Sequence, residues 1–462
     1  MFAISQHVHF IGIGGIGMSG IAEILLNLGM EVSGSDLRRS PVTDRLVRLG
    51  ATVYEGHEAG HVSGATVVVT SSAVSVTNPE VVEAHSRKIP VIQRAEMLAE
   101  LMRLKYGIAI AGMHGKTTTT SMVASVLTAG GLDPTVVVGG RVDALGSNAR
   151  LGTTQYLVAE ADESDRSFLK LSPILAVVTN LDREHMDCYH DMADVEHAFL
   201  AFMDKVPFYG AVTACMDNAQ LAAILPLARR RVFTYGVSSS ADYRLEYLET
   251  EPGCFSRFLV STAAGPLGPF ELHVPGRHNV LNATAAVAIA HQLKVPGEKI
   301  AEGLKHFRGV DRRFQQVGQA HGITVVDDYG HHPTEIRATL AAARECSHKR
   351  IHVVFQPHRY TRTRDLMDEF SGAFKDADSV IVLPIYAASE EAIQGITAEL
   401  LVSKIEGPRV QFAANFAAAL SATAAEARDG DLILTLGAGS VSQLAPQILA
   451  LLESSEEVPP GK

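Results

Sequence analysis

The sequence predicts a three-domain α/β protein with parallel sheets and crossover helices. Its 462 residues are enough for about three domains at roughly 150 residues each. β-rich apolar runs alternate with glycine or histidine turns and with alanine- and leucine-rich helical periods, as in parallel sheets. This pattern restarts with a nucleotide-type turn at residues 8–20 and again at 106–120, and a third unit is expected to start near 323–333. Each restart predicts a new domain.

The domain boundaries are predicted at the residues where one local pattern ends and the next begins. We expect domains at residues 1–104, 105–314 and 315–462. Near residue 104 a helical pattern is followed by a new strand, and near residue 314 a helical stretch is followed by the GVDRRFQ segment. The segment between about 206 and 277 alternates apolar and polar residues, which predicts antiparallel strands or an insertion on the central sheet. The central domain should therefore contain a mixed sheet.

The composition excludes several classes of function. Apolar residues make up 47% and charged residues 20% of the chain, as in folded proteins. The 51 acidic residues outnumber the 40 basic ones, so neither nucleic acid nor a membrane is expected as a main partner. The four cysteines (Cys188, Cys215, Cys254, Cys346) lack a C-x-x-C spacing and suggest neither a disulfide framework nor a zinc site. No signal peptide or membrane-spanning stretch is evident, so we expect a cytoplasmic protein.

The first motif is a glycine turn after the first strand. Gly12, Gly14 and Gly17 fit the pattern G-x-G-x-x-G, with Gly15 between them, and Asp36 follows 19 residues after Gly17. Glycines let the backbone approach a diphosphate, and a helix beginning near residue 18 would direct its N-terminal amides toward it. The motif alone leaves open NAD(P) or FAD, another nucleotide, or a structural turn.

The second motif, GMHGKTTTT at residues 112–120, is more specific. It places Lys116 and Thr117 after a glycine at a strand-to-helix turn, where amides cradle phosphates, the ammonium reaches the outer phosphates and the hydroxyl holds Mg²⁺. The common P-loop would need glycine at 110, where this chain has Ile110. We interpret the shorter loop as an ATP site, with a chance resemblance as the alternative.

Carboxylates follow the next two strands. At the carboxyl edge of a parallel sheet they can complete magnesium coordination beside the phosphates, whereas any single one of them could equally be a solvated loop residue. Glu160 and His185 are the favoured candidates because they lie at strand ends. The two clusters are Glu160, Asp162, Glu163 and Asp165, and Asp182, Glu184, His185 and Asp187.

Three further polar segments are ambiguous by themselves. Asn279 and Asn282 lie on one helical face and suit base or ribose binding, a helix cap or a core amide. Arg313 suits a γ-phosphate or a surface ion pair. The segment PHRYTRTR suits an anionic ligand group or an exposed basic loop. The polar residues of these later segments are Arg312, Arg313, Asp327, Asp328, His331, His332, His358, Arg359, Arg362 and Arg364.

Taken together, the motifs resemble those of the Mur ligases over nearly the whole chain. GIGGIGM, GMHGKTTTT, EADESD, NLDREHMD, HNVLNATAA, DDYGHHPTE and FQPHRYTRT occur in the order and spacing of that family. GIGGIGM and PHRYTRT are typical of its alanine-adding branch, and the D-N-P-R string of the diaminopimelate-adding relatives is absent. The resemblance implies a Rossmann-like N-terminal domain, a central P-loop ATPase-type domain, and a Rossmann-like C-terminal domain that closes over ATP and helps to bind the amino acid.

The resemblance also implies a reaction and its ligands. The expected activity is ATP-dependent ligation of L-alanine to the lactyl carboxylate of UDP-N-acetylmuramate through an acyl phosphate, a cytoplasmic step of peptidoglycan synthesis. Two Mg²⁺ ions, with Mn²⁺ as a substitute, are the expected cofactors, and the oligomeric state stays open. Alternatives are another amino-acid-adding Mur-type ligase, an NAD(P)-dependent dehydrogenase and a non-catalytic ATP-binding regulator.

Site residues are carried over by matching the motifs. The resemblance assigns Lys116, Glu160, His185 and Arg313 to catalysis, and Thr117, Glu160 and His185 to metal binding. The ATP site would comprise Gly112, Met113, His114, Gly115, Lys116, Thr117, Thr118, Asn279, Asn282, Arg313 and Asp328. The UDP-sugar site would comprise Gly12, Gly14, Gly15, Gly17, Asp36, Ser71 and Ser72, and the amino-acid site His358, Arg359 and Arg362.

Two positions depart from the family pattern. Met113 stands where many members have threonine, with little expected loss because a backbone amide cradles the phosphate. Leu200 stands where other Mur ligases carry a carbamylated lysine. The second metal ion must therefore rely on other groups, as in the alanine-adding branch.

Overall fold

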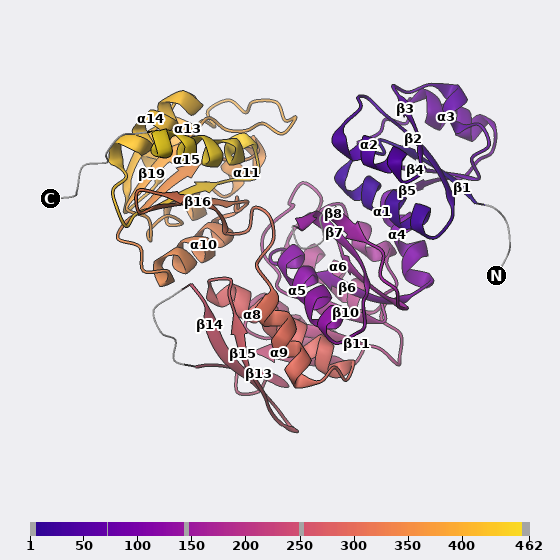
Figure 1. The fold of residues 1–462 in the computed structure, drawn as a ribbon, viewed down its shortest axis with the longest axis horizontal. Helices are drawn as coiled ribbons and strands as arrows, with labels where there is room; N and C mark the ends of the chain where they lie inside the picture. Colours follow the sequence, from indigo (N-terminus) through magenta and orange to yellow (C-terminus); the bar gives the residue numbers. More distant parts are fainter. Residues whose placement is uncertain (1–5, 72, 143–146, 249–253, 455–462) are drawn as a thin grey trace. The chain divides into compact units, whose positions relative to one another are not determined.

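The computed structural model describes residues 6–71, 73–142, 147–248 and 254–454. It contains three sheets, of five, ten and six strands, which confirms the predicted three-domain α/β fold. Figure 1 shows the ribbon of the chain, coloured along the sequence. By compactness, the chain divides into two units. One comprises Met1–Glu246, Leu259–Phe270 and Leu281–His306, and the other Tyr247–Phe258, Glu271–Val280 and Phe307–Lys462. The domain boundaries at 104 and 314 stay predictions.

The N-terminal sheet is entirely parallel, in the order β3-β2-β1-β4-β5. Its central strand, HVHFI, is buried at every position except the half-buried His7, as expected for a strand covered on both faces. The strands are β1 (His7–Ile11), β2 (Glu31–Asp36), β3 (Thr52–Glu55), β4 (Val67–Thr70) and β5 (Val91–Gln93). The helices are α1 (Ile16–Asn27), α2 (Pro41–Arg48), α3 (Pro79–Ser86) and α4 (Arg94–Arg103).

A buried carboxylate ties α3 to this sheet. Glu80 is fully buried in the first turn of α3. Ser35 Oγ donates a hydrogen bond of 2.6 Å to Glu80 Oε2, and His61 Nδ1 lies 2.7 Å from Glu80 Oε1. Burial opposes ionisation, but the hydrogen bonds to His9, Ser35 and His61 outweigh it and lower the pKa of Glu80 to about 2. The ionised carboxylate therefore stabilises the folded state.

We expect Glu80→Gln to reduce the free energy of unfolding by about 2 to 3 kcal/mol at neutral pH. The folded-state pKa lies below the ordinary value of 4.5, so this stabilisation is complete above about pH 5 and is lost as the pH falls toward 2. Urea unfolding of both proteins between pH 7 and pH 3 would measure the difference. A difference that stays constant over this range would contradict the role given to the ionised carboxylate.

The central sheet is mixed and runs in the order β15-β14-β13-β12-β11-β10-β6-β9-β7-β8. From β12 to β7 in this order, each strand pairs in parallel with its neighbour. The last pair, β7 and β8, is antiparallel and lies at the edge of the sheet. Strands do occupy the alternating segment, although β11, β12 and β13 within it pair in parallel with their neighbours.

The bounds in the central region follow. The strands are β6 (Tyr106–Ala111), β7 (Thr135–Val142), β8 (Ser147–Arg150), β9 (Tyr156–Glu160), β10 (Leu175–Val178), β11 (Ala211–Cys215), β12 (Val232–Gly236), β13 (Tyr243–Tyr247), β14 (Ser256–Thr262) and β15 (Gly265–Leu272). The helices are α5 (Lys116–Ala129), α6 (Met192–Met203), α7 (Ala219–Ile224), α8 (Arg277–Gln292) and α9 (Gly297–His306).

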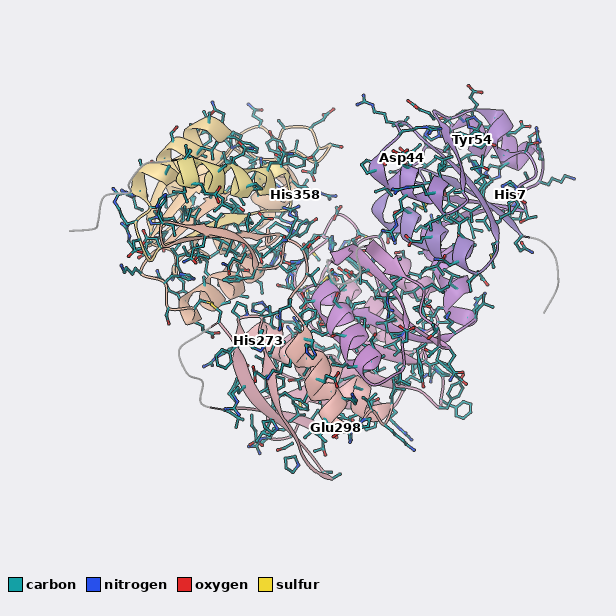
Figure 2. The ribbon with its side chains drawn as sticks, in the orientation of Figure 1. His7, Asp44, Tyr54, His273, Glu298 and His358 are labelled. Carbon is teal, nitrogen blue, oxygen red and sulfur yellow. A yellow bond between two sulfur atoms is a disulfide. The ribbon has the colours of Figure 1, made fainter. Side chains whose placement is uncertain are left out.

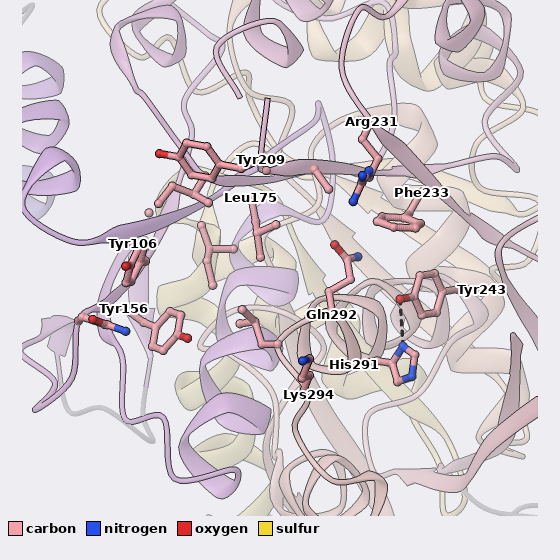
Figure 3. Close-up of a pocket in the computed structure, with 17 residues that line it drawn as sticks. Tyr106, Tyr156, Leu175, Tyr209, Arg231, Phe233, Tyr243, His291, Gln292 and Lys294 are labelled. Carbon is pink, nitrogen blue, oxygen red and sulfur yellow. Dashed lines mark hydrogen bonds between the residues drawn. The ribbon is translucent and has the colours of Figure 1, made fainter. Parts of the chain in front are cut away.

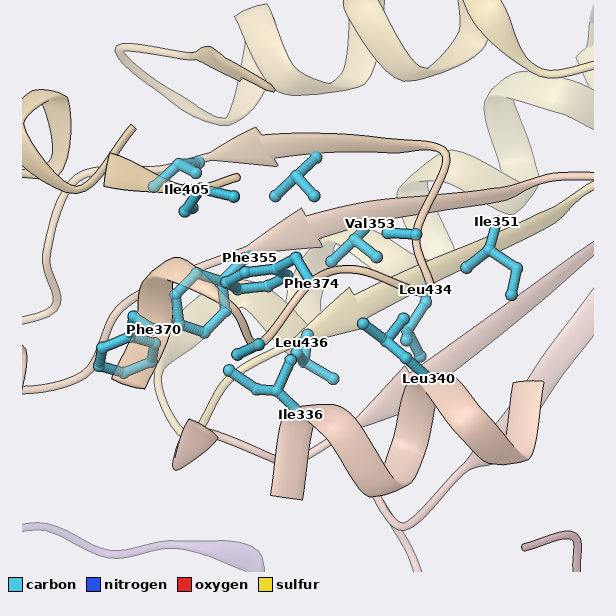
Figure 4. Packing of buried hydrophobic residues seen from close by; sticks show 14 of the residues in the cluster. Ile336, Leu340, Ile351, Val353, Phe355, Phe370, Phe374, Ile405, Leu434 and Leu436 are labelled. Carbon is cyan, nitrogen blue, oxygen red and sulfur yellow. The ribbon is translucent and has the colours of Figure 1, made fainter. Parts of the chain in front are cut away.

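The C-terminal sheet has the order β16-β17-β21-β18-β19-β20, and only its β16–β17 pair is antiparallel. Figure 4 shows its core, where Ile336 and Leu340 of α10 face Phe355 of β18 and Leu434 and Leu436 of β21. The strands are β16 (Gln315–Ala320), β17 (Ile323–Asp328), β18 (Ile351–Phe355), β19 (Ser379–Val382), β20 (Arg409–Phe412) and β21 (Leu432–Leu436). The helices are α10 (Pro333–Glu345), α11 (Tyr360–Asp365), α12 (Met367–Ser371), α13 (Ala398–Lys404), α14 (Phe416–Glu426) and α15 (Leu444–Ser454).

The cysteines depart from the expectation. Their spacing suggested no disulfide framework, but the structure joins Cys254 to Cys346 across 92 residues of sequence. Cys188 and Cys215 carry free thiols. None of the helices in the described residues is both long and apolar enough to cross a membrane.

Candidate active site

The first glycine turn joins β1 to α1. Gly12 has φ +79°, and the backbone amides of Gly12 and Ile13 donate to the Ser35 carbonyl of β2. Gly15 is the N-cap of α1 and provides no side-chain cap, so the first amides of the helix are not covered by a capping side chain. The helix begins at Ile16, two residues before the predicted start. This arrangement suits a diphosphate.

Asp36 supports this turn. Its Oδ2 accepts a hydrogen bond of 2.8 Å from the Gly14 amide, and a Cβ at Gly14 would lie 2.9 Å from the same oxygen. The carboxylate at the end of β2 therefore fixes the position of the turn. Ser71 follows the end of β4 and is half-buried, while Ser72 lies outside the described residues.

The second glycine loop joins β6 to α5 in the central sheet. Gly112 has φ +132°, and a Cβ there would lie 2.0 Å from Thr179 Oγ1. Gly115 has φ +81° and is the N-cap of α5, again without a side-chain cap. Only glycine combines these backbone angles with this close packing. The loop thus exposes the N-terminal amides of α5, as a phosphate site requires.

Lys116 begins α5 and folds back over the loop. Its Nζ donates to the carbonyls of Gly112 (2.8 Å) and Met113 (3.1 Å) and to Glu163 Oε1 (2.7 Å). Burial lowers the pKa of Lys116, but Glu163, Glu160 and Glu184 more than offset this effect and raise it above its ordinary value. The ammonium is therefore charged at neutral pH.

The predicted metal ligands Thr117 and Glu160 contact each other, and His185 lies near Glu163, the partner of Lys116. Thr117 Oγ1 donates to both oxygens of Glu160, at 3.1 and 3.0 Å, and His185 Nε2 lies 3.5 Å from Glu163 Oε1. Glu163 Oε2 is buried and has no hydrogen-bond partner in the part of the chain that the structure describes. Carboxylate and hydroxyl oxygens of this kind are the donors that Mg²⁺ prefers. The residues present therefore fit the expected ion.

Asn180 and Asp182, at the end of β10, hold the other side of the loop. Asn180 Oδ1 accepts from the His114 amide at 2.8 Å, and Asn180 Nδ2 donates to the His114 carbonyl at 3.0 Å. Asp182 Oδ2 lies 2.8 Å from His114 Nε2. Asn180 was not among the site residues predicted from the sequence, and Glu163 was predicted only as one acid of a cluster. Their positions at strand ends were the available signal.

The two asparagines of α8 have different surroundings. Asn282 lies against the loop, since a Cβ on Gly115 would be 2.8 Å from Asn282 Oδ1. Asn279 Nδ2 donates to the Pro275 carbonyl at 2.7 Å at the start of the same helix. Both side chains are buried. Thr118, also predicted for the ATP site, is buried in α5.

In the second unit, Arg313 and Asp328 lie around the end of β17. Arg313 Nη1 donates to Glu335 Oε1 at 3.3 Å, and its guanidinium lies over the Tyr329 ring. Asp328 accepts from the amides of Phe314 and Gly330, both at 2.7 Å. Burial raises the pKa of Asp328 to about 6, despite Arg313 and these two donors. Asp328 thereby organises the segment that carries Arg313.

The basic segment after β18 contains a histidine that accepts hydrogen bonds. Arg362 Nη1 lies 3.0 Å from His358 Nδ1 and donates to the His358 carbonyl at 3.1 Å. The His358 ring, labelled in Figure 2, stacks on Tyr386. Burial, with the neighbouring His331, Arg362 and Arg359, lowers the pKa of His358 to about 3. His358 is therefore neutral and orients Arg362, whereas Arg359 starts α11 with φ +71°.

Two uncapped helix starts, each preceded by a glycine turn, make this an α/β protein with a candidate phosphate-binding loop in each of two domains. Comparisons with known proteins identify the class further. Residues 7–106 match the "Mur ligase family, catalytic domain", residues 110–290 the "Mur ligase middle domain" and residues 312–439 the "Mur ligase, glutamate ligase domain".

Two relatives named UDP-N-acetylmuramate--L-alanine ligase match almost completely. The protein from Acidobacterium capsulatum is 69% identical over 98% of this chain and 99% of its own length. That from Koribacter versatilis is 64% identical over 99% of both. The crystal structure of UDP-N-acetylmuramate-alanine ligase MurC from Thermotoga maritima is 29% identical, with a TM-score of 0.79 over 98% of this chain and 100% of that one.

The chain belongs to the Mur ligase family, and the predicted resemblance is confirmed. It is accordingly an ATP-dependent ligase. This assignment favours the ligase interpretation of the first glycine turn over a dehydrogenase.

Proposed function

We propose that this chain joins L-alanine to the lactyl carboxylate of UDP-N-acetylmuramate, with conversion of ATP to ADP and phosphate, as a cytoplasmic step of peptidoglycan synthesis. The observation that carries the proposal is the full-length similarity, at 69% and 64% identity, to relatives named for this reaction. The geometry of the loop around Lys116 supports it, because an activated acyl group must be made from a nucleotide phosphate.

The chemistry follows from the poor reactivity of a carboxylate toward an amine. A lactyl carboxylate oxygen attacks the γ-phosphorus of ATP, which gives an acyl phosphate and ADP. The neutral amine of L-alanine then attacks the acyl carbon, and phosphate leaves with the oxygen that came from the carboxylate. Lys116 and Arg313 would offset the negative charge that develops on the phosphoryl group.

Each domain would contribute residues to one part of the site. Gly12, Gly14, Gly15 and Gly17 would hold the UDP diphosphate, with Asp36 fixing the turn. Asn279, Asn282 and Asp328 would contribute to nucleotide binding. Thr117, Glu160 and His185 would hold Mg²⁺, which when bound supplies electrostatic stabilisation of phosphoryl charge. Glu163 would keep Lys116 oriented and charged.

Phosphate release with ATP, Mg²⁺ and UDP-N-acetylmuramate tests the proposal when all amino acids are compared separately. We expect L-alanine to give the highest kcat/KM. Glycine and serine should be used more weakly but not excluded, because a methyl or hydroxyl difference changes the binding free energy by only about 1 to 3 kcal/mol. A clear preference for a larger amino acid would identify another amino-acid-adding ligase instead.

The α-carboxylate of alanine should bind the basic segment after β18, since arginine pairs with carboxylates bidentately. We expect Arg359→Ala and Arg362→Ala to raise the KM for alanine roughly 10-fold or more, with little change in the KM for ATP or UDP-sugar. Arg364→Ala is the matched control, because Arg364 pairs with Asp365 and is half exposed. Unchanged alanine KM values in both variants would move the amino-acid site elsewhere, for example to Tyr329 and His331.

A further inference from the structure

The central domain contains a cavity at the edge of the sheet opposite the ATP loop. Its volume is about 790 Å³, within the range of roughly 300 to 1,000 Å³ that is usual for small-molecule sites. The cavity is lined by residues at the amino ends of β6, β9, β10, β11 and β13, together with the end of α8 (Figure 3). The ATP loop follows the carboxyl end of β6, about 20 Å along that strand. The cavity is therefore separate from the phosphate-binding loop.

Aromatic rings form much of the cavity wall. The Tyr106 and Tyr156 rings lie 5.9 Å apart, and Phe233 and Tyr243 lie 6.2 Å apart in an edge-to-face arrangement. Tyr209 adds a ring that is 64% exposed. Such surfaces favour flat ring systems, which gain both apolar burial and ring–ring contacts.

The charges in the cavity are all positive. Arg231 and Lys294 line it, and no aspartate or glutamate is among the lining residues. In the described part of the chain, neither of these two side chains has a hydrogen-bond or ion-pair partner. This local excess of positive charge occurs in a protein with a net charge of −11. An anionic ligand would be attracted by this positive charge and could pair with either cation.

Polar side chains already have internal partners at the back of the cavity. Tyr243 Oη lies 3.1 Å from His291 Nδ1, and Gln292 Nε2 donates to Thr213 Oγ1 at 2.9 Å. These contacts hold the rings in place and leave Arg231 and Lys294 as the groups that can select a ligand by charge.

We propose that this cavity is a binding site for a small anion that carries a flat aromatic or heteroaromatic ring. The ring packs against the aromatic wall, and the carboxylate, sulfonate or phosphate group lies toward Arg231 or Lys294. The site is distinct from those for ATP, UDP-sugar and amino acid.

Fluorescence titration with 8-anilinonaphthalene-1-sulfonate tests this proposal, with saturating ADP and Mg²⁺ present to occupy the nucleotide site. We expect saturable binding to the wild-type protein and about 3- to 5-fold weaker binding by Arg231→Gln, Lys294→Gln and Tyr209→Ala, because one such exposed contact contributes at most about a 5-fold change in affinity. Arg229→Gln is the matched control: this arginine is exposed two residues before Arg231 but does not line the cavity. It should bind within about 2-fold of wild type.

Two further binding measurements define the chemical class of the ligand. N-phenyl-1-naphthylamine, which lacks the sulfonate, should bind the wild-type, Arg231→Gln and Lys294→Gln proteins equally. Phenyl phosphate or 4-hydroxyphenylacetate should displace the sulfonate probe, and the better competitor identifies the preferred anionic group. The three replaced side chains are exposed, so we expect all three variants to fold. Their melting temperatures, compared with that of the wild-type protein, check this. Wild-type affinity in all three variants, an equal loss in Arg229→Gln, or no displacement by either competitor would overturn the proposal.

Discussion

Lys116→Ala is expected to abolish nearly all ligase turnover, with a loss on the order of 10² to 10³ in kcat or more. The Lys116 ammonium lies at the start of α5, between the loop carbonyls and Glu163, where it can reach phosphate groups above the loop. Its removal takes away positive charge where the phosphoryl group develops negative charge. Steady-state phosphate release at saturating substrates would measure the loss.

The fold must be checked separately, because Lys116→Ala leaves Glu163 without its cation. Glu163 is only 1% exposed, and an unpaired buried charge is costly. The double variant Lys116→Ala/Glu163→Gln removes that charge and should recover the melting temperature without recovering turnover. If the stable double variant keeps near-normal turnover, Lys116 does not serve the phosphates.

Gly14→Val should have the second large effect, which is loss of UDP-sugar binding with ATP binding largely intact. A Cβ at Gly14 would lie 2.9 Å from Asp36 Oδ2 and 3.1 Å from Thr43 Cγ2. Valine would therefore disrupt the Gly14–Asp36 hydrogen bond and fill the space that a diphosphate needs. Calorimetric titration with UDP-N-acetylmuramate and, separately, with an ATP analogue would measure both affinities.

The control for this variant is Gly60→Val in the same domain. A Cβ at Gly60 meets no atom within 4 Å, so the change adds the same side chain in open space. We expect affinity for the UDP-sugar within about 2-fold of wild type. A variant Gly14→Val that loses ATP affinity and keeps UDP-sugar affinity would reverse the two site assignments.

Local patterns predicted most of the fold because each element has its own sequence signal. The apolar strand 106–111 and the threonine-rich helix after Gly115 match β6 and α5. The start of α1 was placed two residues late, because Gly15 caps the helix without a capping side chain that sequence rules could recognise. The parallel pairing of β12 with β13 was missed, since alternation indicates burial on one face and leaves strand direction open.

Long-range partners were the main limit on predicting the site. The pairing of Lys116 with Glu163 spans 47 residues, and that of Cys254 with Cys346 spans 92. Neither follows from spacing, because the tertiary fold alone decides which strand ends meet. Asp36 illustrates the same point: its position 19 residues after Gly17 made it part of the nucleotide motif, but its hydrogen bond with the Gly14 amide is evident only in the structure.

The central claim is that the lactyl carboxylate is activated by phosphorylation and then transferred to L-alanine. The most direct measurement uses UDP-N-acetylmuramate with ¹⁸O in both lactyl carboxylate oxygens, together with ATP, Mg²⁺ and L-alanine. Mass spectrometry should show one ¹⁸O in the released phosphate and one in the amide product, because the carboxylate oxygen that attacks phosphorus leaves with it. Phosphate without ¹⁸O, or phosphate release without an alanine adduct, would contradict the account.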